Sequence, residues 1–333
     1  MAGVFISGTG YHHPERRVTN DDLARQMDTS DAWIREHTGI VERRYADEGV
    51  DTSDLGALAT RNALEHAGWH PAELELFVCA SSTPDCLEPA TASFIAEKLR
   101  LRAVAFDVNA ACSGFVYGLA VARGLMEAQG YERAAVCAAD KYTKVIDPTD
   151  RRNSIFFGDS AATVMLQREV PAVGAEVVDL VMENLNEGAG LAKTPIRGYF
   201  SMAGGEVKRI ATKGLVDSAT DILRRNRLDP EDLRAFMAHQ VNLRLLESLA
   251  DTLGVQPDRH WHNVESHGNQ GAAGVLTTFC AGVERHVDDL KDGDLLLLTV
   301  YGGGFTGGSA LLRWIDRRKQ SAKPRHTADR PAQ

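Results

Sequence analysis

Short apolar runs that alternate with amphipathic stretches restrict the fold of this 333-residue chain more than any other feature. The runs at residues 4–7, 76–80, 103–108 and 134–138 have the length of buried strands and lie between turn-forming residues. Helical periodicity predicts helices at 53–66, where Ser53 is expected to be the N-cap, at 91–101 and at 113–129. This alternation predicts an α/β fold built on a largely buried sheet.

The second half of the chain repeats the rhythm of the first. It has a strand-like run at 236–238, helical patterns at 243–253 and 272–287, and a strong strand at 294–301. The segments GDSAATVML at 158–166 and GGSALLRWI at 307–315 both pass from glycine through a small polar turn to a closing strand. We therefore predict two similar halves, residues 1–170 and 171–316. The basic, proline-containing tail 317–333 has almost nothing to bury and is predicted to be disordered.

Composition excludes several classes of protein. Forty-six acidic against 37 basic residues give a net charge of −9, which argues against a general nucleic-acid or anionic-membrane surface. Five cysteines without paired spacing do not describe a disulfide framework and favour a reducing, cytoplasmic setting. The N-terminus lacks the pattern of a signal peptide, and no later apolar run is long enough to span a membrane.

Cys112 is the candidate nucleophile. It follows an apolar strand directly and stands at the start of a long apolar helix, where backbone N–H groups favour a thiolate and can stabilise an oxyanion. Its small neighbours would let a thioester approach closely. The competing interpretation is a buried structural cysteine, and it is preferred for Cys79, Cys137 and Cys280, which lie inside apolar segments.

His239 and Asn269 are the candidate partners of Cys112. His239 follows a short apolar strand, and Asn269 occupies a glycine-rich loop before a helix. Polar side chains at the C-terminal ends of strands meet in one crevice of an open α/β sheet, so the three residues are expected to share a cavity. The GGGFTG run at 302–307 formally matches a dinucleotide-binding motif, but a strand follows it instead of a helix, so a tight glycine turn is the better interpretation. No phosphate-binding loop and no zinc-ligand spacing is present, which leaves thiol chemistry without a metal or cofactor.

Motifs spread over nearly the whole chain up to Ile315 resemble those of the 3-oxoacyl-[acyl-carrier-protein] synthase III family of thiolase-like condensing enzymes. The motifs are TGI-x-ER (38–43), DVNAACSGF around Cys112, DPTDR (147–151), FGDSAA (157–162), HQ-x-NLR (239–244), N-x-x-x-x-GN (263–269) and GGGFT (302–306).

The resemblance implies a duplicated five-layered α/β/α/β/α fold, a homodimer, and Cys112, His239 and Asn269 as the catalytic triad. Cys112 would take an acyl group from a thioester of coenzyme A or an acyl carrier protein. His239 and Asn269 would then stabilise the enolate formed when a malonyl thioester loses carbon dioxide, and the carbanion would attack the acylated sulfur. The backbone amides of Cys112 and Gly303 would form the oxyanion hole. No cofactor beyond the thioester substrates is implied.

The resemblance also places the carrier site. Trp33 and Arg151 match positions that hold the adenine of coenzyme A, and Asn242 and Arg244 match residues at the mouth of the pantetheine channel and on the carrier-docking face. Glu88, before Pro89, stands near the expected dimer contact and acyl pocket, where a hydrophobic residue is common.

Several positions depart from the family pattern. Val41, Gly205 and the pair Asp251–Thr252 each remove a group that would hold phosphate or an acidic carrier, and Gln270–Gly271 replace the usual Thr-Ser after the catalytic asparagine. These changes are compatible with an enzyme that starts a specialised polyketide or fatty-acid chain.

Two other functions remain open from the sequence. The same acyl-Cys112 intermediate could pass its acyl group to an alcohol or amine, or two acyl thioesters could be joined without malonyl decarboxylation. The third interpretation is a non-catalytic partner subunit that keeps the fold.

Overall fold

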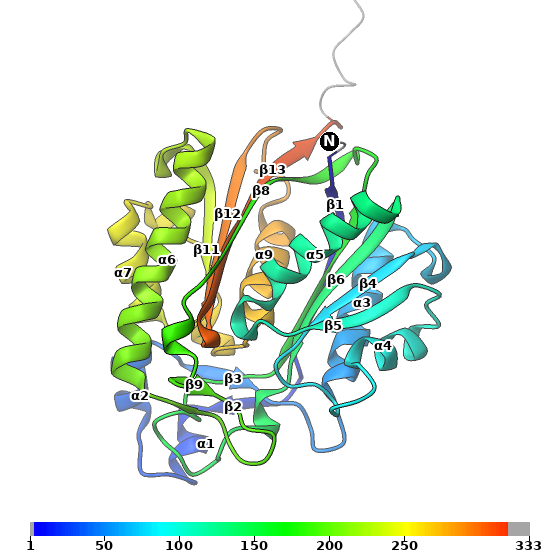
Figure 1. Cartoon of the computed structure of the whole chain (residues 1–333). Helices are drawn as coiled ribbons and strands as arrows, with labels where there is room; N and C mark the ends of the chain where they lie inside the picture. Colours follow the sequence, from blue (N-terminus) through cyan, green and yellow to red (C-terminus); the bar gives the residue numbers. More distant parts are fainter. Residues whose placement is uncertain (1–2, 319–333) are drawn as a thin grey trace, which may run out of the picture.

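The computed structural model describes residues 3–318, which form one mixed nine-stranded sheet with helices on its faces (Figure 1). The strand order is β11-β12-β13-β8-β1-β7-β6-β4-β5. The strands are β1 Phe5–His12, β4 Leu76–Ala80, β5 Val104–Val108, β6 Arg133–Asp140, β7 Ser160–Gln167, β8 Val173–Asn184, β11 Leu233–Ala238, β12 Leu295–Gly302 and β13 Thr306–Asp316. Two short hairpin-like pairs add β2 Arg17–Thr19 with β3 Glu42–Arg44 and β9 Ala192–Lys193 with β10 Ser201–Met202.

Helices of very different lengths connect these strands. The α-helices are α1 Asn20–Ala24, α2 Asp31–Thr38, α3 Thr52–Ala67, α4 Thr91–Leu99, α5 Gly114–Gln129, α6 Gly204–Asn226, α7 Leu243–Leu253, α8 Val264–His267 and α9 Ala273–His286. Short 3₁₀ turns are η1 Pro71–Glu73, η2 Ala111–Ser113, η3 Tyr142–Lys144, η4 Asn186–Gly188, η5 Pro230–Asp232, η6 Pro257–Arg259 and η7 Gly303–Phe305.

The layers follow from which helix covers which face. Helices α3 and α4 pack on the arm of the sheet formed by β1, β7, β6, β4 and β5, and α6 covers the arm formed by β8, β13 and β12, with α7 beside it. Helices α5 and α9 lie between the two arms and contact both (Figure 1). The expected thiolase-like α/β/α/β/α layering is therefore present. The arms join where β1 pairs with β8 at Phe5–Glu176 and Ile6–Ala175.

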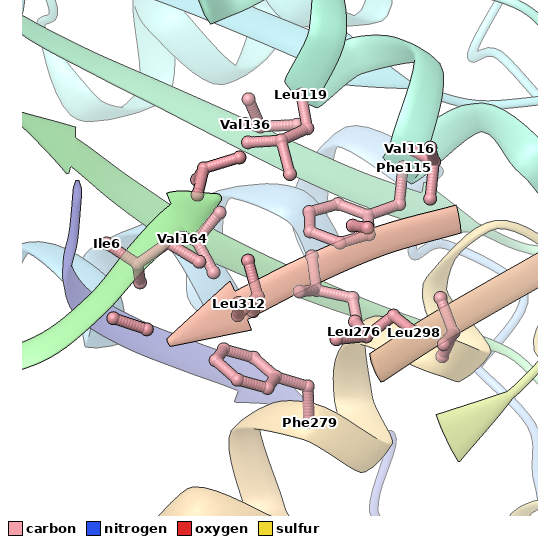
Figure 2. Packing of buried hydrophobic residues seen from close by; sticks show 14 of the residues in the cluster. Ile6, Phe115, Val116, Leu119, Val136, Val164, Leu276, Phe279, Leu298 and Leu312 are labelled. Atoms are coloured by element: carbon pink, nitrogen blue, oxygen red, sulfur yellow. The ribbon is translucent and has the colours of Figure 1, made fainter. Parts of the chain in front are cut away.

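The main core lies in this central layer. Figure 2 shows Phe115 and Leu119 of α5 and Leu276 and Phe279 of α9 packed among side chains of the surrounding strands. Their strand partners include Ile6, Val136, Val164, Leu298 and Leu312. Because two helices are buried on both sides, their sequences are apolar around much of their circumference, which is typical of a central helix.

The expected elements agree closely with the observed ones, and the domain boundary at residue 170 stays a prediction. Strand β4 and helix α7 have the predicted bounds. The predicted N-cap of α3 was wrong: the helix begins one residue earlier, with Asp51 as N-cap and its backbone N–H donating to the Asp54 carboxylate at 2.8 Å. Ser53 is buried and accepts a hydrogen bond from Lys98 at 2.6 Å.

Strand β5 differs from the other apolar runs in its exposure. It pairs only with β4, so it forms one edge of the sheet, and the side chain of Val104 is 53% exposed. The expectation of a fully buried strand was wrong here because no other strand among residues 3–318 pairs with that edge. The predicted disorder of 317–333 lies outside the described residues except for Arg317 and Arg318. Within residues 3–318, no helix combines the length and apolarity that a membrane span requires.

Candidate active site

Three distant segments bring Cys112, His239 and Asn269 to one cavity of about 470 Å³. Cys112 follows β5, His239 follows β11 directly, and Asn269 lies just before α9. The chain therefore delivers all three side chains to one end of the molecule, as the rule for open α/β sheets predicts.

The turn that carries Cys112 is held from both sides by one threonine. The Ser113 hydroxyl donates to the Thr306 carbonyl at 2.8 Å, and the Thr306 hydroxyl donates to the Ala110 carbonyl at 2.8 Å. Between them, Ala111 adopts a positive φ of 47°, a conformation that side chains rarely take. The turn η2 is thus anchored to the start of β13, which gives the sulfur a defined position.

The glycine run 302–304 forms the tight turn that the sequence predicted, between β12 and β13. A Cβ on Gly302 would lie 2.7 Å from the backbone nitrogen of Cys112, so only glycine permits this approach. Gly303 lines the cavity together with Cys112. Gly304 has a φ of 129°, which favours glycine strongly. The two predicted oxyanion-hole residues therefore line one cavity.

The pKa of the Cys112 thiol is governed mainly by desolvation. Desolvation, with the buried Asp140 carboxylate as the second cause, raises this pKa to about 12. Desolvation thus opposes the thiolate that the helix terminus favours. The proton of the thiol must therefore leave when the sulfur attacks a substrate.

His239 is a neutral imidazole at physiological pH. The residue is 4% exposed, and burial lowers the pKa of its ring to about 4. Its backbone N–H donates to the Thr299 carbonyl at 2.9 Å, while Nδ1 is buried without a hydrogen-bond partner among the described residues. The backbone of His239 is thus attached to β12, and a neutral imidazole can either accept or donate a proton in the cavity.

Asn269 has a carboxamide whose orientation is fixed by one backbone amide. Its Oδ1 accepts a hydrogen bond from the Gly271 N–H at 3.0 Å, which leaves Nδ2 to donate into the cavity. Its backbone N–H donates to the Phe156 carbonyl at 2.7 Å, and its own carbonyl accepts from Gly158 at 3.0 Å. The loop before α9 is thereby attached to the segment before β7.

Several motif residues outside the triad support it through buried hydrogen bonds. The Gln240 side chain accepts from the Asn263 backbone N–H at 2.9 Å and donates to the Ala238 carbonyl at 2.7 Å. The Gln270 side chain donates to the Asn263 side chain at 3.0 Å and accepts from Thr277 at 2.8 Å. The segment after β11 and the loop of Asn269 are therefore one connected unit, and Gln270 has a structural role despite departing from the family pattern.

Sequence reasoning missed a polar cluster beside the nucleophile, formed by Ser82, Asp140 and Tyr142. Ser82 and Tyr142 line the cavity with Cys112, and Asp140 is fully buried behind them. Burial raises the pKa of the Asp140 carboxyl. The only available signal was weak, since a polar Asp140 ends the apolar run of β6.

Of the residues predicted to bind coenzyme A or the carrier, Trp33 and Arg151 contact each other, and Asn242 and Arg244 line the cavity. The guanidinium carbon of Arg151 lies 4.6 Å from the centre of the Trp33 ring, and Arg151 also contacts Asp28 at 3.3 Å. The Asn242 side chain caps α7 by accepting from Leu245 at 2.9 Å, so it also has a structural function.

Cations gather where the cavity opens to solvent. Four exposed side chains line it there, although the whole chain is acidic: Arg152, Lys193, Lys208 and Arg244. Such a mouth attracts phosphate groups.

Glu88 does not line this cavity within one chain. It is exposed in the loop before α4, so its assignment to the acyl pocket is not supported in the single chain. The other departures from the family pattern also lie at the surface or in loops: Gly205 is exposed in the first turn of α6, and Asp251 and Thr252 are exposed at the end of α7.

Comparison with known proteins tests the resemblance. Residues 106–185 match the family model 3-oxoacyl-[acyl-carrier-protein (ACP)] synthase III, and residues 223–314 match the model of its C-terminal part. The beta-ketoacyl-[acyl-carrier-protein] synthase III of Rhodospirillum centenum is 39% identical over 319 residues, covering 93% of this chain and 98% of that protein. The chain belongs to the 3-oxoacyl-[acyl-carrier-protein] synthase III family.

Other members of the synthase III family agree with this assignment. Beta-ketoacyl-[acyl-carrier-protein] synthase III 2 of Streptomyces coelicolor is 39% identical over 94% of both chains. The crystal structure of the synthase III of Pseudomonas aeruginosa superimposes with a TM-score of 0.88 at 35% identity, over 94% of this chain and 98% of that one. The priming beta-ketosynthase of the R1128 polyketide pathway gives a TM-score of 0.86 at 31% identity, over 94% and 97%.

The two family models together cover the segments that carry Cys112, His239, Asn269 and Gly303. The protein is therefore an acyltransferase of the thiolase-like condensing type, with relatives in both fatty-acid and polyketide priming.

Proposed function

We propose that this protein condenses an acyl thioester with a malonyl thioester, using Cys112 as nucleophile and His239 and Asn269 as stabilisers of the malonyl enolate. The observation that carries the proposal is the shared cavity, in which the Asn269 carboxamide is oriented with Nδ2 free to donate. Non-catalytic homologues would have no need for this orientation.

In the first half-reaction the Cys112 sulfur attacks the thioester carbonyl. The proton of the thiol passes to the neutral His239 imidazole and then to the departing carrier thiolate, so atoms and charges balance. The developing oxyanion receives hydrogen bonds from the backbone amides of Cys112 and Gly303. The acyl-enzyme and a free carrier thiol are the products of this half-reaction.

In the second half-reaction a malonyl thioester enters the same cavity. N–H donors from His239 and Asn269 Nδ2 bind its thioester carbonyl and stabilise the enolate that remains when carbon dioxide leaves. The enolate carbon attacks the acyl group on Cys112 and the C–S bond to Cys112 breaks, which releases a 3-oxoacyl thioester and the Cys112 thiolate. The thiolate then takes up a proton from solvent. Burial of His239 supports this step because a neutral ring forms no ion pair with the malonyl carboxylate that would oppose its departure.

The carriers are coenzyme A and an acyl carrier protein. The four cations at the cavity mouth support the binding of a phosphate or of the acidic groups of a carrier. Trp33 and Arg151 stack on one another, so a planar base would part the two side chains and be held between them. Asn242 and Arg244 line the cavity and would contact the pantetheine chain of a bound carrier.

The protein acts as a homodimer. The uncovered edge strand β5 and the neighbouring loop expose apolar side chains, with Val104 at 53% and Leu87 at 79% exposed. An open edge of this kind is stabilised by pairing with another strand. Glu88 lies beside Leu87 in the same loop, so in a dimer it would lie at the contact between the subunits.

The test is product formation from an acyl-CoA panel with malonyl-carrier supplied or withheld. We expect 3-oxoacyl product and carbon dioxide only when malonyl-carrier is present, and loss of the complete condensation in Cys112→Ala. Full condensation activity in that variant would exclude Cys112 as nucleophile. Acyl esters or amides, or a condensation product formed without malonyl-carrier, would instead identify one of the other acyl-transfer functions.

A further inference from the structure

Tyr142 lies against the nucleophile and is part of a buried hydrogen-bonded chain. The residue is 4% exposed, lines the cavity with Cys112, and belongs to the short turn η3 after β6. Its ring stacks on Phe157 with a centroid distance of 4.3 Å and an interplanar angle of 12°. Opposite the ring, Gly271 leaves the needed space, since a Cβ there would lie 2.3 Å from Tyr142 Cε2. The hydroxyl group is therefore held in one place.

The hydroxyl of Tyr142 has two neighbours for a single proton. It lies 3.1 Å from the Ser82 hydroxyl, and it lines the same cavity as the Cys112 sulfur. The Ser82 hydroxyl is itself 3.1 Å from the Asp140 carboxylate and donates to it. Because that donation uses the only proton of Ser82, the serine oxygen can only accept from Tyr142.

Asp140 fixes the direction of this chain. It accepts hydrogen bonds from the amides of Ser82, Thr83 and Ala272 and from the hydroxyls of Ser81, Ser82 and Thr83. With donors on both oxygens, the carboxyl group acts as an acceptor. At rest, therefore, Tyr142 donates to Ser82.

We propose that the Tyr142 hydroxyl is a further catalytic group, which turns its proton from Ser82 to the Cys112 sulfur when the thiol is deprotonated. The thiolate then gains a charge-assisted hydrogen bond at the moment at which it must attack. The thiol proton leaves to His239 as in the proposed acylation, and the Tyr142 proton only changes its acceptor, so no proton is lost or gained. When the sulfur is acylated, the Tyr142 proton returns to Ser82.

The groups proposed to act on Cys112 are Asp140 and Tyr142, at and just after the end of β6, and His239, just after β11. Asp140, at the end of β6, opposes ionisation of the thiol, and the Tyr142 hydrogen bond favours it. His239 from the segment after β11 lines the same cavity and is neutral above about pH 4. The inference rests on the proposed function only in taking Cys112 as the nucleophile.

The experiment is the rate of Cys112 alkylation by iodoacetamide between pH 6 and pH 10, without any acyl or malonyl substrate. The parent is the full chain with Cys86→Ser, because Cys86 is the exposed cysteine and the other three are buried. We expect Tyr142→Phe to slow alkylation at pH 8 about tenfold and to shift the pH profile upward, since a hydrogen bond to a charged group is lost. The phenylalanine ring keeps the stack on Phe157.

Ser82→Ala supplies the opposite prediction. Removing the resting acceptor frees the Tyr142 proton for the sulfur, so alkylation should become about threefold faster and the profile should shift downward. A merely structural role would slow both variants or neither. Tyr117→Phe is the matched control: its hydroxyl donates to the Glu183 carbonyl at 2.8 Å, and its loss should leave the profile unchanged.

Three results would overturn the inference: an unchanged profile in Tyr142→Phe, slower alkylation in Ser82→Ala, or an equal shift in Tyr117→Phe. Each variant is first checked for an unchanged circular dichroism spectrum, and if one fails to fold the direction seen in the other decides. The condensation assay remains separate, because a Cys112→Ala variant that still condenses would remove the proposed function, whatever the alkylation profile shows.

Discussion

At the scale of single residues, the site works with neutral groups held in fixed orientations. Desolvation raises the pKa of the Cys112 thiol and lowers that of the His239 imidazole. Asn269 carries no charge, and a single amide from Gly271 selects which end of its carboxamide faces the cavity. Charge therefore develops in this site only during the reaction, when donors are already in place to receive it.

Asn269→Asp tests this donor directly. The aspartate keeps the shape and can still accept from Gly271, but it replaces Nδ2 with an acceptor next to the malonyl carbonyl. We expect the rate of carbon dioxide release to fall about 10²- to 10³-fold, the usual cost of removing such a donor. Acylation of Cys112, followed by intact-protein mass spectrometry, should continue. Equal loss of both steps would contradict the assigned role.

The pH dependence of decarboxylation tests His239. An ordinary histidine with a pKa near 6.5 would lose its neutral form on acidification below about pH 6.5. Since burial lowers the pKa of His239 to about 4, the ring stays neutral and the acid limb of the decarboxylation rate should lie near pH 4. The rate of malonyl decarboxylation is measured between pH 3.5 and 8, with circular dichroism at each pH to separate unfolding. An acid limb centred near pH 6.5 in folded protein would contradict this.

At the scale of elements, the central helix α5 and the outer helix α6 differ in how tightly their glycines are packed. Gly124 lies in the interior of α5 with nothing within 4 Å of a Cβ placed on it. Gly214 lies in the interior of α6, where a Cβ would meet the Tyr301 ring at 2.1 Å. The same glycine-to-alanine change therefore has opposite consequences in two helices of one protein.

Gly124→Ala should stabilise the protein by about 0.5–1 kcal/mol, because alanine loses less backbone entropy in a helix. Gly214→Ala should destabilise it by about 1–3 kcal/mol, since the extra methyl group forces the buried Tyr301 ring to move. Urea unfolding followed by circular dichroism measures both changes. A gain in stability for Gly214→Ala would show that the contact between α6 and Tyr301 is looser than described.

At the scale of the whole molecule, one sheet runs through both arms and ends at the uncovered strand β5. Every other strand of the first arm has a partner on each side. The exposed apolar side chains of Val104 and Leu87 lie at this end of the sheet. Strand β5 is therefore the edge at which the second copy of the proposed dimer would continue the sheet.

Val104→Glu should convert the proposed dimer to a monomer, because a buried glutamate would lose its hydration at the contact. Sedimentation velocity at micromolar concentration measures the change. Ile196→Glu is the matched control, since Ile196 is 83% exposed but lies between β9 and β10, which are not part of the nine-stranded sheet. A dimer that survives Val104→Glu and dissociates with Ile196→Glu would place the contact elsewhere.

Much of this arrangement could be predicted from the residues alone. Apolar runs predicted β4 and β12, helical periodicity predicted α7 and α9, and the glycine turn before β13 followed from the strand after it. These features depend on local periodicity, which can be recognised in short stretches of sequence. Helix α6 was not singled out, because its buried positions begin only at Ala211, well after its polar first turns.

The nucleophile, its histidine and its asparagine could be named from sequence because motif and strand-end position coincide at all three. Their ionisation could not, since the pKa of Cys112 depends on desolvation and on Asp140, which lies 28 residues along the chain. The contact of Tyr142 with Cys112 likewise arises only when β6 is placed beside β4. Sequence alone thus determined which reactive groups and which helices and strands this chain contains. Tertiary packing decided the solvent exposure, the mutual distances and the ionisation of those groups, because burial and distance depend on segments that folding brings together.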